Sequence, residues 1–200
     1  MGTDLTMTPG RVHGHRRGPA PRVVALLLAL LLAGCGGAAT PEPAPAAAYN
    51  GTDVMFLQMS LEYIAQGDRV VSPAARRAAD PRIRALATEL GGQWAAEAAT
   101  MRRWLTGWQQ PASADPDAGA HAGHGDLHSL RPSDIAELTA AKGGDFDRTA
   151  VSLLLGHLHN CVEVARMESA GGRYPPARDL AGRMTVARQS QIQRLLGLAA

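Results

Sequence analysis

Apolar residues spaced three and four positions apart are the feature that most limits how this chain can fold. One stripe between residues 81 and 108 contains Ile83, Leu86, Leu90, Trp94, Met101, Leu105 and Trp108. A second stripe between residues 151 and 165 contains Val151, Leu154, Leu155, Leu158, Val162 and Ala165. This spacing places the apolar side chains on one face of an α-helix. The chain has no long run that alternates as a half-buried strand does, and we therefore expect an all-α fold.

The helical segments recur at a fixed offset of 94 residues. Units 50–108 and 144–200 align without a gap. The identical pairs include Asp53 with Asp147, Val70 with Val164, Pro81 with Pro175, Arg84 with Arg178, and Leu86-Ala87 with Leu180-Ala181. We interpret the units as copies of one helical hairpin, and two hairpins that bury their stripes on each other form a four-helix bundle. Trp104 lies off the first stripe, and we expect it to cover one end of the bundle.

Proline and glycine indicate where the helices begin and end. Asp80 before Pro81 is an N-cap followed by proline at the first helical position. Gly171-Gly172 is expected to end one helix of the second unit, and Pro175-Pro176 to precede the next.

Two further segments modify this plan. A short helix is expected near residues 133–141, before Gly143-Gly144, in the connection between the units. Pro73 falls inside the first helix of the first unit, where a proline stops or kinks a helix. We therefore expect the first helix to be irregular after Val71.

Residues 1–34 have the parts of a secretion signal. A basic start is followed by the apolar run from Val23 to Ala33, whose 11 residues fall short of the roughly 20 that a membrane-spanning helix needs. Leu32-Ala33-Gly34-Cys35 then resembles the lipobox of bacterial lipoproteins. We expect cleavage before Cys35 and anchoring of the mature chain to the extracytoplasmic face of the cell membrane by a lipid on this cysteine. Ordinary signal-peptide cleavage with an incidental cysteine is the alternative.

The basic pI belongs to the signal and does not indicate a nucleic-acid surface on the mature chain. Four arginines and Asp4 lie in the signal, which leaves 16 Lys and Arg against 17 Asp and Glu, a net charge of −1. Residues 35–49 form a Gly, Ala and Pro-rich tether, and residues 50–200 suffice for one domain. Cys161 is the only cysteine left besides Cys35, so we expect no internal disulfide.

Four segments resemble a known family. They are Asp80-Pro81-Arg82-Ile83-Arg84-Ala85-Leu86-Ala87, Met101-Arg102-Arg103-Trp104-Leu105, Phe56-Leu57-Gln58-Met59 and Asp145-Phe146-Asp147-Arg148. Over residues 50–200 the chain is similar to the domain of unknown function 305 family. The resemblance implies a ferritin-like four-helix fold, frequent export and, for some members, a link to copper handling.

The histidines that mark this family are largely replaced here. Its first His-His pair falls on Tyr63-Ile64 and the acidic residue that follows falls on Arg69. Its second pair falls on His157-Leu158, and the second acidic residue is kept as Glu163. The resemblance therefore implies the fold more firmly than it implies the metal site.

His157, Cys161 and Glu163 remain as candidate metal ligands on one predicted helix. His157 and Cys161 are four residues apart and share a face, whereas Glu163 shares its face with His159. Imidazole with thiolate suits Cu(I) or zinc. A third ligand would come from another helix, with Met59, Glu62 and Tyr63 as the candidates. The alternative is a small buried cysteine with two boundary histidines in solvent.

The connection 109–132 contains His121, His124 and His128 within eight residues, together with Asp126. Imidazole is a common ligand of copper, nickel and zinc, so this segment could hold a divalent ion weakly. The alternative is a polar spacer that happens to contain histidines.

The sequence motifs give little support for an enzymatic function. The chain shows no Ser-His-Asp order, no phosphate-binding glycine loop and no Glu-x-x-His motif, so we expect no enzyme. We expect a lipid-anchored protein that binds or buffers a transition metal, with copper or zinc as the ligand. The alternative is a metal-free structural or protein-interaction lipoprotein, and the sequence indicates no particular protein partner.

Overall fold

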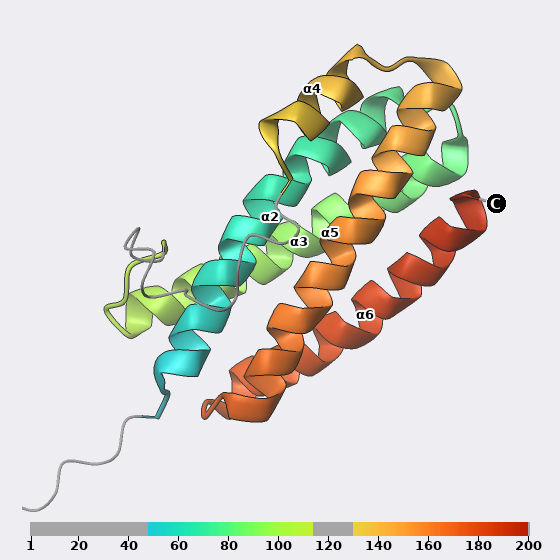
Figure 1. The fold of residues 1–200 in the computed structure, drawn as a ribbon. Helices are drawn as coiled ribbons and strands as arrows, with labels where there is room; N and C mark the ends of the chain where they lie inside the picture. Colours follow the sequence, from blue (N-terminus) through green and yellow to red (C-terminus); the bar gives the residue numbers. More distant parts are fainter. Residues whose placement is uncertain (1–47, 114–129, 200) are drawn as a thin grey trace, which may run out of the picture. The chain divides into compact units, whose positions relative to one another are not determined.

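The computed structural model describes residues 48–113 and 130–199, which belong to one compact unit, Ala46–Ala200. These residues form five helices and no strand, so the predicted all-α fold is confirmed (Figure 1). The helices are α2 (Gly51–Arg77), α3 (Pro81–Gly107), α4 (Pro132–Ala140), α5 (Gly143–Gly171) and α6 (Pro175–Ala199). The predicted signal, Cys35 and the linker histidines His121, His124 and His128 lie outside the described residues.

The long helices pair as the two predicted hairpins. α2 packs on α3 and α5 packs on α6, while α2 and α5 pack on each other in the middle of the bundle (Figure 1). The short helix α4 packs mainly on α5. α3 and α6 approach each other little through their backbones, and long polar side chains span the space between them. This arrangement is the four-helix bundle with one extra helix that the sequence predicts.

The helices begin and end close to the predicted positions. Asp80 caps α3 by accepting a hydrogen bond from the backbone N–H of Arg82 at 2.7 Å, and Pro81 is the first helical residue. α5 ends at Gly171, and α6 begins at Pro175. Local capping chemistry therefore sets the hairpin turns.

The prediction that the first helix becomes irregular after Val71 is wrong. α2 runs without interruption to Arg77 with Pro73 inside it. Val70, Val71 and Ala74 around the proline are all fully or almost fully buried. Packing of this turn against the core offsets the hydrogen bond that proline cannot make.

Two apolar clusters fill the interior of the bundle. The first includes Val70, Leu86, Leu90, Phe146, Leu154 and Leu158. The second includes Phe56, Leu57, Met101, Leu105, Leu180 and Met184. Polar groups lie where the clusters meet, with Glu97 on α3, Cys161 on α5 and Arg188 on α6. The predicted stripes thus supply most of the core, although Trp108 and Leu155 are only half-buried, and a polar layer interrupts it.

The two hairpins exchange hydrogen bonds at equivalent positions. The Asp53 carboxylate accepts from the backbone N–H groups of Arg173 and Tyr174, in the turn before α6. The Asp147 carboxylate accepts from the N–H groups of Ala79 and Asp80, in the turn before α3, both at 2.8 Å. Donors and acceptors are related by the same offset of 94 residues. The identical aspartates therefore tie each hairpin to the turn of the other.

Candidate metal-binding site

The structure separates the predicted ligands of α5 into two faces. His157 and Cys161 point into the bundle and are 1% and 7% exposed. Glu163 lies on the outside and forms an ion pair with Arg166 at 2.7 Å. His159 is also exposed, with its ring nitrogen Nδ1 2.7 Å from the carbonyl oxygen of Leu155. Only His157 and Cys161 of the described candidates therefore share an interior site.

His157 lies in an aromatic setting at the centre of the bundle. Its ring is 5.7 Å from the ring of Tyr63, edge to face, and 5.7 Å from the ring of Trp94. A Cβ atom on Gly67 would lie 2.5 Å from the Nε2 atom of His157, so only glycine leaves room for the imidazole. Tyr63 and His157 are equivalent positions of the two copies, which meet here across α2 and α5.

Burial keeps the His157 imidazole neutral. Neither ring nitrogen has a hydrogen-bond partner among the described residues. Loss of hydration lowers the pKa of His157 to about 4, and the positive charge of Arg188 acts in the same direction. The backbone of Tyr63 acts in the opposite direction and limits this fall in pKa. At neutral pH the ring therefore keeps an unshared lone pair in a dry environment.

The Cys161 thiol lies one helical turn further along α5. Burial raises the pKa of Cys161 to about 11, and the Arg188 guanidinium limits this rise while Glu97 adds to it. The thiol is therefore protonated at neutral pH, and it would become a thiolate only where a soft metal ion displaces the proton.

A buried ion pair forms the wall of the site on the side of α3 and α6. Arg188 of α6 donates to Glu97 of α3, and its guanidinium carbon lies 5.6 Å from the Trp94 ring centroid. Burial raises the pKa of Glu97, although the charge of Arg188 opposes the rise. Gln191 donates to Gln93 beside this pair at 2.8 Å.

Neither Arg188 nor Glu97 was among the predicted site residues. Arg188 lies four residues from both Met184 and Ile192, which are buried. A charged residue within an apolar stripe was therefore the sequence feature that could have indicated a buried arginine. Because a buried guanidinium needs an anionic partner, this spacing also implied an acidic residue on a facing helix.

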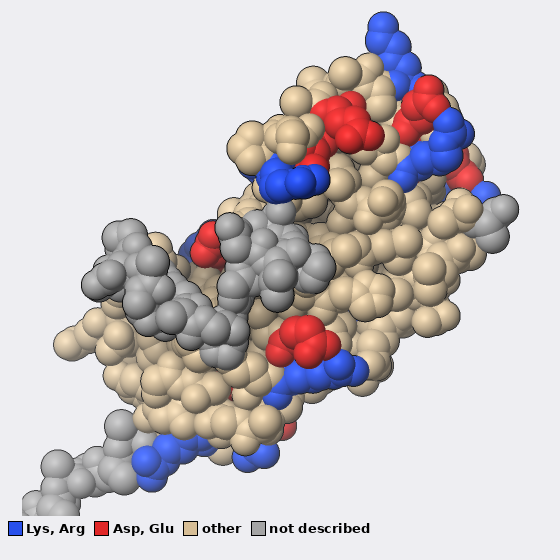
Figure 2. All heavy atoms as spheres, in the orientation of Figure 1, with Lys and Arg blue, Asp and Glu red and all other residues tan. Residues whose placement is uncertain are grey.

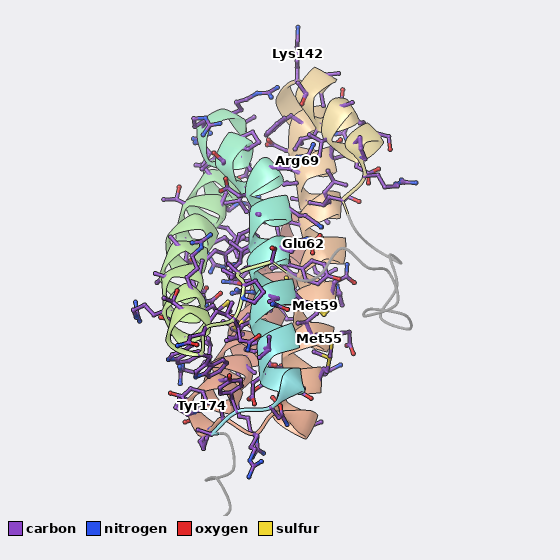
Figure 3. The ribbon with its side chains drawn as sticks, turned by 90° about the vertical axis from the view of Figure 1, so that its left-hand side faces the viewer. Met55, Met59, Glu62, Arg69, Lys142 and Tyr174 are labelled. Carbon is purple, nitrogen blue, oxygen red and sulfur yellow. The ribbon has the colours of Figure 1, made fainter. Side chains whose placement is uncertain are left out.

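The interior site offers two donor atoms for a metal. The described residues contain no group of three His, Cys, Asp or Glu side chains close enough to hold an ion. Of the proposed third ligands, Tyr63 contacts the His157 ring, whereas Glu62 is exposed and binds Gln66. Figure 3 places Met59 and Glu62 along one side of α2. Imidazole and thiolate without a third ligand fit low-coordinate Cu(I) and do not fit four-coordinate zinc.

A separate surface pocket of about 460 Å³ lies near the N-terminal ends of α3 and α5. Its lining includes Ile83, Asp147 and Leu155 and none of the predicted ligands. The pocket is therefore distinct from the candidate metal site.

The family of the chain follows from its helical domain. A family model described as domain of unknown function DUF305 matches residues 53–199. The chain belongs to the DUF305 family. The resemblance seen in the sequence motifs is thereby confirmed. A comparison with curated proteins gave no match.

Solved structures share the fold of this DUF305 domain. A DUF305 protein from Streptomyces coelicolor has a TM-score of 0.68 at 19% identity, covering 74% of this chain and 91% of that one. A DUF305 fragment from Deinococcus radiodurans has a TM-score of 0.64 at 19% identity, covering 75% and 96%. CopM in its Cu(II)-bound form has a TM-score of 0.62 at 18% identity, covering 74% and 95%. At these identities the likeness establishes the bundle fold.

Proposed function

We propose that this DUF305 protein binds a transition-metal ion, copper in the first place, outside the cytoplasmic membrane to which its lipid anchors it. The observation that carries the proposal is the buried His157 imidazole, which has no hydrogen-bond partner among the described residues and lies one turn from Cys161. Family membership supports it, because CopM of the same fold has been crystallised with Cu(I) and Cu(II).

The protein groups around the site have distinct roles in this proposal. His157 supplies a neutral lone pair without competition from protons, because its pKa lies near 4. Cys161 supplies sulfur and releases its proton on binding, so affinity should rise with pH. Arg188 stabilises the negative charge that would appear on sulfur, Trp94 packs against the His157 ring, and Gly67 leaves room for that ring. Copper would supply soft-acid coordination that favours thiolate and imidazole over water.

Membrane attachment in this proposal depends on Cys35. The motif Leu32-Ala33-Gly34-Cys35 supports lipidation. In residues 48–113 and 130–199, no helix combines the length and apolar character that crossing a bilayer requires. The lipid would therefore hold the domain at the extracytoplasmic face.

A second metal-binding segment is proposed for the linker. His121, His124 and His128 supply three imidazoles within eight residues, which suits weak binding of a divalent ion. This segment and the helical site differ in preferred ion, because the linker lacks sulfur. We assign no catalytic step to either.

One observation favours the alternative function of a metal-free structural or interaction lipoprotein. The described residues hold two interior donors and no third, and burial alone explains a neutral histidine beside a protonated cysteine. The two functions differ in whether Cu(I) displaces the Cys161 proton.

The test is a competition titration of the mature chain with Cu(I) against a chromophoric chelator. We expect His157→Gln and Cys161→Ala each to weaken Cu(I) binding by at least about tenfold, which corresponds to losing one ligand bond. His159→Gln is the matched control, since this histidine lies on the same helix but outside the bundle, and it should leave the affinity unchanged. Equal effects of the two histidine variants would rule out the interior site.

The linker is tested separately with Cu(II) and Zn(II). The triple variant His121→Gln/His124→Gln/His128→Gln should lose divalent binding and keep Cu(I) binding. If the triple variant removes all metal binding, the linker holds the metal and His157 and Cys161 form no metal site.

A further inference from the structure

Aromatic side chains gather at the end of the bundle where the described chain begins. The ring of Tyr49 stacks on that of Trp108, with centroids 4.2 Å apart and planes at 11°. The ring of Tyr174 meets Trp104 at 5.5 Å and Trp108 at 5.1 Å, edge to face in both cases. All four side chains are half-buried. The predicted role of Trp104 at one end of the bundle is confirmed, and this end also holds the α5–α6 turn.

Four exposed arginines lie at the same end of the bundle. Arg102 and Arg103 near the end of α3, Arg173 in the turn and Arg178 in the first turn of α6 are exposed. None forms an ion pair among the described residues. We call the four arginines and four aromatic residues the tether-end face. Figure 2 shows Lys and Arg atoms at the lower end of the molecule, where Figure 1 places the α5–α6 turn.

The opposite end of the bundle has both paired and unpaired basic groups. Three exposed arginines there form ion pairs, Arg82 with Asp80, Arg131 with Asp134 and Arg148 with Asp145. Three further exposed bases at that end, Arg76, Arg77 and Lys142, form no ion pair among the described residues. Half-buried tryptophan and tyrosine rings beside unpaired arginines therefore distinguish the tether-end face, in a mature chain whose net charge is −1.

Two of the acidic side chains at the tether end of the bundle are buried. Asp53 and Glu168 are both 0% exposed. Burial and the nearby Asp53 raise the pKa of Glu168 to about 8, so it is mostly uncharged at neutral pH. The exposed acidic residues here are Asp179, and Glu163 in its pair with Arg166. The face thus presents an excess of guanidinium groups beside aromatic rings.

We propose that the tether-end face docks on a bilayer that contains anionic lipids. Guanidinium groups bind phosphate in a bidentate manner, and tryptophan and tyrosine favour the boundary between lipid headgroups and acyl chains. Near an anionic surface each arginine strengthens binding by about fivefold. An acidic protein surface would satisfy the arginines but would give no reason for the exposed edges of amphipathic rings between them.

The attachment point of the chain makes weak docking sufficient. Tyr49 belongs to the face, and 13 residues separate it from Cys35. A segment of this length reaches at most about 50 Å and averages about 20 Å between its ends. A lipid on Cys35 would therefore keep the face at a high local concentration next to the membrane. The biological setting rests on the lipid anchor of the proposed function, whereas the lipid affinity of the face does not.

The test uses the mature chain with Cys35→Ser, which carries no lipid, in flotation with vesicles of phosphatidylglycerol and phosphatidylcholine. We expect binding to these vesicles and none to pure phosphatidylcholine. The quadruple variant Arg102→Gln/Arg103→Gln/Arg173→Gln/Arg178→Gln should bind at least about tenfold more weakly. The matched control is Arg69→Gln/Arg76→Gln/Arg82→Gln/Arg148→Gln, which removes the same charge elsewhere and should stay within about twofold. Unchanged circular dichroism is required of both variants.

Tryptophan fluorescence identifies the docked surface. Brominated lipids should quench Trp104 and Trp108 and leave Trp94, which is 2% exposed in the core, unquenched. Equal losses in the two quadruple variants, binding to neutral vesicles, or absence of binding would overturn the proposal. Binding to polyglutamate as tight as to anionic vesicles, without quenching, would assign the face to an acidic macromolecule instead. The copper titration does not involve these arginines, so either proposal can fail alone.

Discussion

The turn between α2 and α3 and the turn between α5 and α6 occupy equivalent places in the two copies but are filled differently. In each turn, backbone N–H groups donate hydrogen bonds to a carboxylate of the other hairpin. This carboxylate is Asp147 in the first turn and Asp53 in the second. The buried side chain behind each turn differs. Ala74 lies behind the first turn, and Glu168 occupies the equivalent position behind the second. The comparison shows that hydrogen bonds to the backbone fix the turn, whereas the side chains packed behind it can diverge.

The buried Glu168 behind the second turn has two structural consequences. A Cβ atom on Gly172 would collide with the Glu168 carboxylate, whereas the equivalent Ala78 faces the small Ala74 and keeps its methyl group. Glu168 as a carboxylate has no hydrogen-bond partner among the described residues, but as an acid it can donate to Asp53. Two buried carboxyl groups thus share one proton at this turn.

Removing the aspartates should expose the largest difference between the turns. Asp53 accepts from the N–H groups of Asn50, Arg173 and Tyr174 and is fully buried, whereas Asp147 is half-buried and accepts two hydrogen bonds. We expect Asp53→Ala to lower the free energy of unfolding by about 3–5 kcal/mol and Asp147→Ala by about 1–2 kcal/mol. Urea unfolding measures both. Equal losses would mean that the turns depend equally on their capping carboxylates.

Replacing the side chains of the second turn by those of the first should show that the effects of substitutions at Glu168 and Gly172 on stability depend on each other. Gly172→Ala should lower the free energy of unfolding by about 2–3 kcal/mol, because the new methyl group collides with the Glu168 carboxylate. The double variant Glu168→Ala/Gly172→Ala reproduces the first turn and should recover most of this loss. If the double variant is no more stable than Gly172→Ala, the collision is not the cause.

The pH dependence of stability should distinguish the second turn from the first. The pKa of Glu168 in the folded chain is about 8, above its unfolded value of 4.5, because of burial and the charge of Asp53, with Arg178 opposing. Its contribution is therefore fully present below pH 4.5 and is lost as the pH rises through 8. We expect wild type to lose about 2 kcal/mol relative to Glu168→Gln between pH 5 and 9. Parallel profiles in thermal unfolding would contradict the shared proton.

His157 should give a smaller dependence of the opposite sign, away from both turns. Its pKa is about 4 in the folded chain and 6.5 when unfolded, because burial disfavours the imidazolium. The folded state should therefore lose stability as the pH falls from 6.5 toward 4. Relative to His157→Gln, we expect wild type to lose on the order of 1–2 kcal/mol in urea unfolding over this interval. His159→Gln is the control and should follow wild type.

The backbone of this fold was largely predictable from the sequence, because its determinants are local. Periodic apolar residues gave the helices, and Asp80, Pro81 and Gly171 gave their ends. The prediction drawn from Pro73 was wrong, because packing of this turn against the core outweighed the tendency of proline to break a helix.

The chemistry of the interior was less predictable, because it depends on residues far apart in the chain meeting at one point. Glu97 and Arg188 come from different hairpins, as do Asp53 and Glu168. Glu168 is four residues beyond Val164, in register with the buried face of α5, so its burial could be suspected but its partner could not. His157 was identified as a candidate, whereas its dry aromatic setting required coordinates.

The exchange of Asp53 and Asp147 between turns has a meaning for the origin of the chain. Each hairpin lacks, within itself, the carboxylate that completes its own turn. Two identical hairpins facing each other across a twofold axis would supply it reciprocally, as isologous dimers do. An ancestral gene with one hairpin would thus have encoded an obligate homodimer. Fusion of duplicated copies would then leave the two halves free to become unequal, as Tyr63 on one side of the axis and His157 on the other are.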